Sequence, residues 1–216
     1  MSRIFVNTAA LQEAWQQLLD RSGAAPGLAA RLFRRLEAHY MAPERAYHNL
    51  AHVRDVLDVV DTLAAHCPQP DAVRLAAWLH DVVYVPGAGD NEHQSAVLAA
   101  AWLAEAGLPQ PLYAEGARLI VLTATHEPAP GDGNGAVLVD ADLASLAASP
   151  AQYKRHAQAI RQEFAAVPDD AYRRGRAQVV RRFLARPFIF HTAPMRTTHE
   201  SAARRNLTRE LDTLRD

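Results

Sequence analysis

The segment AAWLHDVVY, residues 76–84, places a histidine and an aspartate side by side at the end of an apolar, helix-like run. His80 continues the helical face that carries Val73 and Ala77, so it is expected to point into the core. A buried carboxylate such as that of Asp81 costs free energy unless a basic side chain, a backbone donor or a metal ion pairs with it. The partner must therefore come from elsewhere in the chain.

Helical periodicity extends from this segment through nearly the whole chain. Residues with a preference for helix starts lie where helices would begin, with Asn7 or Thr8 before the first and Ser149 followed by Pro150 before a later one. We expect one further helix from about Pro111 to His126. The sequence predicts an all-α, single-domain helical bundle of about nine to ten helices over residues 1–216.

Period-two alternation, the mark of a strand, is scarce. The stretch GAVLVDADL, residues 135–143, is the only one that favours a strand.

The composition limits the classes of function. The chain has 216 residues, is 49% hydrophobic and has a net charge of −1, so it can bury a sizeable core and carries no overall basic field. One cysteine, Cys67, excludes an intramolecular disulfide and sites built from several cysteines. No membrane-spanning run or signal-peptide core is evident, so we expect a soluble cytoplasmic protein with no membrane partner.

An arginine-rich stretch, RRGRAQVVRRFLAR at residues 173–186, fits either a nucleic-acid patch or an amphipathic helix with a charged outer face. Its apolar residues Val179, Val180 and Phe183 recur at helical spacing, which favours the second interpretation. We therefore expect no nucleic-acid polymer among the partners.

Three further segments carry imidazoles or carboxylates where an apolar side chain is expected. They are YHNLAHV (47–53), LTATHEP (122–128) and VLVDADL (137–143). A single buried histidine is usually a hydrogen-bonded core residue, and a single aspartate in an apolar run is usually a cap or a bend. Four such segments, with no Lys or Arg on the same faces, favour a shared divalent cation.

The other six histidines are expected to have ordinary structural or surface roles. They are His39, His66, His93, His156, His191 and His199.

The ligand types restrict the ion and its chemistry. Imidazoles and carboxylates without sulfur suit Mn, Fe, Co, Ni, Zn or Mg. Four protein ligands in an octahedral shell leave two positions for water or substrate. Because a bound ion lowers the pKa of water from about 15.7 to about 7–9, these residues predict hydrolysis.

The ordered segments HVRDV, LHDVVY and DADL resemble the HD superfamily of metal-dependent phosphohydrolases, helical proteins that bind their ion through a His … His-Asp … Asp pattern. The metal ligands that the resemblance implies are His52, His80, Asp81 and Asp142. It favours Asp142 over Asp140, which would then lie behind the ligands. It also implies an HD-type domain that hydrolyses a nucleotide or another small phosphate ester with a metal-activated water.

The segment YHNLAHVRDV, residues 47–56, also resembles the signature of the cyclic-nucleotide phosphodiesterases. There the first histidine protonates the leaving oxygen and the second binds metal, which implies His48 as general acid and His52 as ligand. The two share a side if the helix has begun by residue 48. This chain differs from those enzymes because it is shorter and lacks their further histidine after the His-Asp pair.

A subgroup of small bacterial predicted HD-superfamily phosphohydrolases is more similar. The matching segments cover most of the chain and are YHNLAHV, LHDVVY, DNEHQSA, DADLASLA and FIFHTAPMRTTHESAARRNLTREL.

Four residues near these motifs are further candidates for catalysis or substrate binding. Glu92, in a first helical turn after a Gly-rich bend, is suited to orient the attacking water, although the helix dipole alone favours an acid there. Asn91 and Arg45 are candidates for binding the substrate phosphate. His126 is suited to bind either that phosphate or a second ion.

Two other functions fit the same residues. One is oxygenation at a di-iron site, which helical His-Asp sites of this superfamily also host, but only His126 is spare as an extra ligand. The other is a non-catalytic, metal-bound module that senses a ligand. His48 argues against that module, because a structural metal site needs no proton donor.

Overall fold

The computed structural model describes residues 7–214, and over these residues the fold is all-α, as predicted. The described part of the chain forms eleven α-helices, two short 3-10 helices and no strand. In chain order they are α1 (Thr8–Arg21), α2 (Leu28–Tyr40), α3 (Leu50–Thr62), η1 (Ala64–His66), α4 (Pro70–Leu79), α5 (Asn91–Glu105), α6 (Gln110–Leu122), α7 (Gly133–Leu143), η2 (Ala144–Ala147), α8 (Pro150–Glu163), α9 (Asp169–Ala185), α10 (Ala193–Thr198) and α11 (Glu200–Thr213).

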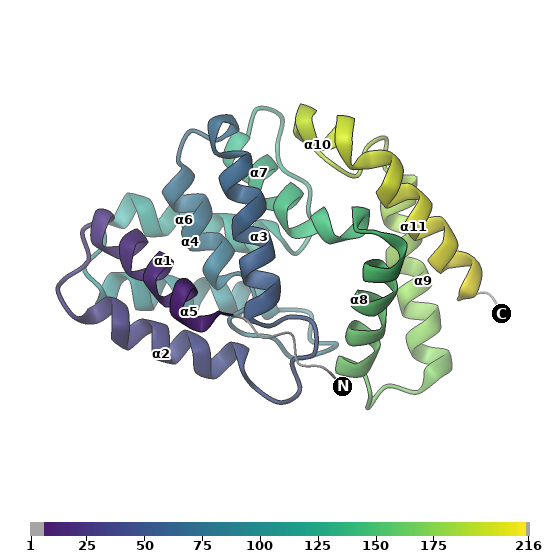
Figure 1. Ribbon diagram of the computed structural model, residues 1–216, viewed down its shortest axis with the longest axis horizontal. Coiled ribbons are helices and arrows are strands. Elements are labelled where there is room, and N and C mark those ends of the chain that lie inside the picture. The colour runs from purple at the N-terminus through teal and green to yellow at the C-terminus, as the bar shows by residue number, and fades with distance from the viewer. Residues whose placement is uncertain (1–6, 215–216) are drawn as a thin grey trace.

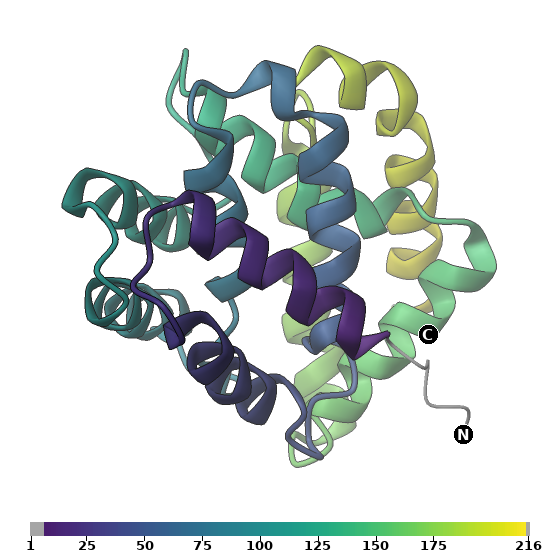
Figure 2. The same ribbon diagram turned by 60° about the vertical axis from the view of Figure 1, so that its left-hand side comes forward.

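Three helices at the centre pack against one another, and the residues predicted to bind metal lie on these helices or at their ends. These are α3, α4 and α7, each in contact with the other two. Figure 1 shows α1 and α2 on one side of them and α8, α9 and α11 on the other. Figure 2 shows α1 at the front of the molecule, where it packs against α2 and α4. None of the described helices has the length and apolar character needed to cross a lipid bilayer.

The second half of α4 is buried on almost every side. The five residues that follow Arg74, LAAWL at 75–79, are all apolar. The Trp78 ring meets the edge of Trp15 with 5.4 Å between ring centroids, and Trp15 Nε1 donates to the Ala29 carbonyl at 3.0 Å. These contacts attach α1 and α2 to α4. They also fix the direction in which the chain leaves the helix toward His80.

The sequence-based helix starts are confirmed at both named positions. The Asn7 side chain accepts from the Ala10 amide at 3.3 Å, and Ser149 forms a reciprocal capping box with Gln152 ahead of Pro150. The local capping signal is therefore sufficient to locate these ends.

The strand suggested for residues 135–143 is wrong, because this stretch lies within α7. Asp132 caps the helix by accepting from the Gly135 amide at 2.8 Å. Since α7 is buried nearly all round, its sequence lacks the one-sided apolar stripe that identifies a surface helix. The helix turns Asp140 and Asp142 about 200° apart.

The helix expected to reach His126 ends earlier, at Leu122. His126 lies beyond that end with φ 54°, in the left-handed region. Its imidazole is therefore placed by the turn after α6 and not by the helical stripe through Leu119 and Leu122.

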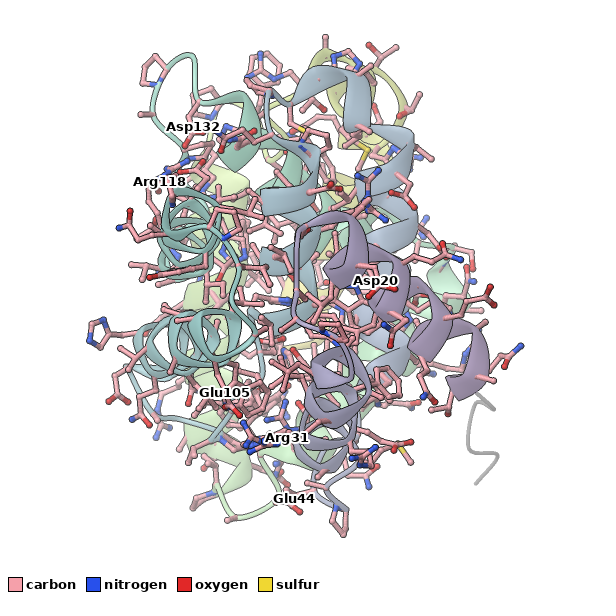
Figure 3. All side chains as sticks on the ribbon, turned by 90° about the vertical axis from the view of Figure 1, so that its left-hand side faces the viewer. Asp20, Arg31, Glu44, Glu105, Arg118 and Asp132 are labelled. Atoms are coloured by element: carbon pink, nitrogen blue, oxygen red, sulfur yellow. The ribbon has the colours of Figure 1, made fainter. Side chains whose placement is uncertain are left out.

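Charged side chains on the outer faces form ion pairs that join neighbouring helices. Figure 3 labels Arg31 beside Glu105 and Arg118 beside Asp132, pairs that close at 3.1 Å and 2.8 Å. Such exposed pairs contribute little to stability because water and salt screen them. The ionisable side chains between α3, α4 and α7 differ from these surface pairs because they are largely buried.

Candidate metal centre

Four of the residues singled out from the sequence converge between α3, α4 and α7. The Nε2 atoms of His52 and His80 lie 3.1 Å apart. Asp81 Oδ2 lies 3.1 Å from His80 Nε2 and 3.7 Å from His52 Nε2. Asp142 Oδ1 lies 3.2 Å from His52 Nε2 and 3.5 Å from His80 Nε2. We call His52, His80, Asp81 and Asp142 the His-Asp cluster.

The helix ends explain how neighbours in sequence reach the same point. His52 lies in the first turn of α3, after Asn49 caps that helix through the Ala51 amide. His80 is the C-cap of α4, so the chain has left the helix at Asp81. The freer backbone there lets both side chains of the pair face one centre.

The ligand atoms of His52, His80 and Asp81 lie close enough together to hold one divalent ion, and Asp142 Oδ1 lies beside both imidazoles. Ligand atoms about 2.1 Å from an ion lie about 3.0 Å apart at right angles and about 3.4 Å apart in a tetrahedron. The contacts to Asp142 and between the two imidazoles fall near that range, and the 3.7 Å contact is slightly longer. His80 Nδ1 donates to the Ala77 carbonyl at 3.0 Å, so Nε2 is the ring atom that would bind an ion, as in metal-bound histidines.

The electrostatics of the cluster also suit a cation. Burial would raise the pKa of both carboxyls, but the facing imidazoles outweigh it and hold the pKa of Asp81 and Asp142 below the usual range. Burial likewise lowers the pKa of His80, but Asp81 and Asp142 outweigh it and raise that pKa. The cluster therefore concentrates negative charge that a proton or a divalent ion can neutralise.

The cluster is more open on its carboxylate side. The side chains of Asp81 and Asp142 are 14% and 15% exposed, against 2% for His80. His48 is 20% exposed. The two carboxylates and His48 are therefore more accessible to solvent than the buried imidazole of His80.

His48 stands beside the cluster and outside it. Because α3 begins at Leu50, the helical relation considered for His48 and His52 does not apply, and the loop before the helix places His48. Its ring centroid lies 5.8 Å from that of His52, and the Tyr84 ring stacks on it at 4.0 Å. His48 Nδ1 lies 2.6 Å from Glu163 Oε2.

Glu163 is the residue of this site that the sequence did not reveal. Its side chain is fully buried at the end of α8, and its Oε1 accepts from the amides of Tyr47 and His48 at 2.7 Å and 2.9 Å. Burial raises the pKa of Glu163, but the His48 contact outweighs it and lowers that pKa. An ionised Glu163 only accepts, so His48 Nδ1 donates to it and Nε2 takes no part in that contact.

Arg45 and Asn91 have hydrogen bonds that hold loops together. The Arg45 guanidinium donates to the carbonyls of His48 and Val82, at 3.1 Å and 3.0 Å, and also to that of Asp81. The Asn91 amide bonds both backbone groups of Val85, at 2.9 Å and 3.0 Å. These contacts position the segment after the His-Asp pair, and binding of a phosphate by either side chain stays a prediction.

Glu92 lies in the first turn of α5, partly exposed. It has no hydrogen bond or ion pair to the cluster within the described residues, so its role in orienting water also stays a prediction.

The two aspartates of DADL have different partners. Asp140 is fully buried, and its Oδ1 and Oδ2 accept from the amides of His191 and Thr192, each at 2.7 Å. Asp142 faces the imidazoles of the cluster and also lies 2.8 Å from His126 Nε2. The structure thus brings Asp142 to the cluster and uses Asp140 to attach the segment after α9.

We expect Asp140→Asn to lower stability and to weaken metal binding far less than Asp142→Asn, which removes it. An amide at position 140 accepts through one oxygen only, so one buried amide loses its partner at a cost of about 1–3 kcal/mol. For a chain of this length that corresponds to a fall in Tm of about 3–10 °C. Thermal unfolding and elemental analysis of both variants give the comparison. The reverse order of metal loss would contradict the assignment of the two aspartates.

Comparison with known proteins adds no identification. No model of a protein family matches the chain, and the search of curated proteins gave no significant match. Any functional conclusion therefore depends on the residues and their geometry.

Proposed function

We propose that this protein is a metal-dependent phosphohydrolase of the HD type that acts on a nucleotide or another small phosphate ester. The observation that carries the proposal is the convergence of two imidazoles and two carboxylates beside a histidine paired with a buried carboxylate. The resemblance of the sequence to the HD superfamily supports it, because the implied ligands are the same four residues.

In this proposal His52, His80, Asp81 and Asp142 hold one divalent ion, with Mn, Mg, Ni, Co, Fe and Zn as candidates. Such an ion, when bound, supplies positive charge for phosphate oxygens and makes water more acidic, which is the chemistry that ester hydrolysis needs. The exposed edges of the two carboxylates leave that side of the centre accessible to substrate.

His48 is the proton donor in the proposed reaction. Attack of water on phosphorus breaks the bond to the leaving oxygen, and His48 Nε2 gives its proton to that oxygen. Glu163 accepts from Nδ1, so it fixes the orientation of the ring. The stacked ring of Tyr84 restricts His48 further.

The proton-handling pair also distinguishes the proposal from its alternatives. A metal-bound sensing module has no use for a buried glutamate that orients a histidine beside the ion. Di-iron oxygenation needs further ligands, and His126 already contacts Asp142 through Nε2 at 2.8 Å.

The test is a hydrolysis screen on metal-stripped protein to which one ion at a time is returned. The substrates include nitrophenyl phosphate, bis-nitrophenyl phosphate, nucleoside mono-, di- and triphosphates and cyclic nucleotides, each with Mn, Ni, Co, Mg, Fe(II) or Zn. We expect turnover only with an ion, and none in Asp81→Ala. Tight ion binding with no turnover of any ester would favour the sensing module instead.

A further inference from the structure

We infer that His126 positions the carboxylate of Asp142 for metal binding, and that Arg186 and His191 hold His126 in the conformation that does so. The inference rests on the proposed metal centre and assigns residues that act through a ligand without touching the ion. It gives His126 a role other than binding phosphate or a second ion.

The two oxygens of Asp142 face different partners. Oδ1 lies 3.2 Å from His52 Nε2 and 3.5 Å from His80 Nε2, whereas Oδ2 lies 2.8 Å from His126 Nε2. An ionised carboxylate accepts, so the His126 ring donates to Oδ2. A carboxylate held by one oxygen cannot rotate freely, and Asp142 therefore presents Oδ1 to the centre of the cluster.

The backbone at His126 is held in an unfavourable conformation. Among the described residues, His126 is the only one other than glycine with positive φ, at 54°. A side chain in this region costs of the order of 1 kcal/mol or more, and it persists only where its surroundings enforce it. The conformation carries the chain out of α6 and brings the imidazole to Asp142.

The enforcing contacts come from the segment that follows α9. Arg186 Nη1 donates to the His126 carbonyl at 3.1 Å, and Arg186 Nη2 donates to the Thr125 carbonyl at 2.7 Å. His191 Nε2 also donates to the His126 carbonyl, at 3.3 Å. The Arg186 side chain is 10% exposed, and its bond to the His126 carbonyl is partly buried.

Helix α7 completes this set of contacts as a ring. Asp140 accepts from the amides of His191 and Thr192, which attaches the segment after α9 to α7. In the same segment, His191 bonds the His126 carbonyl, and the His126 ring in turn contacts Asp142 of α7. The Asp142 carboxylate is therefore oriented by three connected parts of the chain. These are the turn after α6, α7 itself and the segment after α9.

The experiment measures Mn²⁺ affinity by calorimetric titration of metal-stripped proteins. Removal of a group that orients a metal ligand typically weakens affinity 10–100-fold, and we expect that loss in His126→Leu at an unchanged stoichiometry. His126→Gln should recover most of the affinity, because its amide can donate to Asp142 Oδ2. Arg186→Met should also weaken binding, and Arg182→Met, at an exposed position of α9, should not.

The outcomes separate this inference from the proposed function. Wild-type protein that binds no ion would remove the metal centre itself. Wild-type protein that binds one ion, with His126→Leu equally tight, would overturn the positioning role and leave the centre intact. Two ions in the wild type and one in His126→Leu would make His126 a ligand. If His126→Leu does not fold, wild-type affinity in Arg186→Met overturns the inference.

Discussion

Asp81→Ala is expected to empty the metal centre. The substitution removes the oxygen that lies 3.1 Å from His80 Nε2, and with it one of the two negative charges that attract the ion. Elemental analysis after dialysis against metal-free buffer should find about one ion per wild-type chain and almost none in the variant. Asp58→Ala, at an exposed position of α3, is the matched control and should keep its metal.

Thermal unfolding gives a second measurement of the same loss. An ion that binds only the folded state stabilises it by about 2.7 kcal/mol at a free concentration of 100 times Kd. A chelator should therefore lower the Tm of the wild type and leave that of Asp81→Ala unchanged. Full metal content in Asp81→Ala would remove Asp81 from the ligand set.

His48→Ala is expected to keep the ion and lose catalysis. General acids contribute about 10²–10⁴-fold, so kcat should fall by that factor on an ester with a poor leaving group, such as an alkyl phosphate. Nitrophenolate needs little protonation, so the loss on nitrophenyl phosphate should be smaller. Glu163→Gln should lower kcat by a smaller factor with the same dependence on the leaving group, because a neutral amide holds the His48 ring less firmly than the carboxylate does. His93→Ala, at an exposed position, is the control.

Two outcomes would assign His48 differently. Equal losses on both esters, with the ion retained, would mean that His48 positions the phosphate. Loss of the ion would mean that His48 is a ligand, despite its 2.6 Å contact with Glu163.

The sequence predicted the fold class because helical periodicity is a local pattern, whereas the choice of His52, His80, Asp81 and Asp142 depended on the resemblance to the HD superfamily. Helical periodicity and capping residues are read within a few turns, and His52 and His80 stand out because they interrupt apolar faces. The strand suggested for residues 135–143 was wrong because local patterns can mislead. A helix that is buried on all sides has no one-sided apolar stripe to identify it. The end of α6 was misplaced because distant backbone contacts stabilise the unusual turn at His126.

Glu163 could not be predicted from the local pattern. It ends an amphipathic helix in a setting where a glutamate is normally solvated, and its partner His48 lies 115 residues earlier in the chain. The role of His191 could not be predicted from the local pattern either, and an ordinary role was expected for it. Its contacts with His126 and Asp140 join segments that are far apart in sequence.

The contacts that Glu163, Arg186 and His191 make have a consequence for local unfolding. These residues belong to the part of the chain from α8 onward, whereas the four cluster residues lie within residues 52–142. An opening that separates the later helices from α7 would free His126, and we expect it to lower affinity for the ion. Because coupling is reciprocal, we expect a bound ion to slow hydrogen exchange in the helices from α8 to α11 as well, although none of them supplies a proposed ligand.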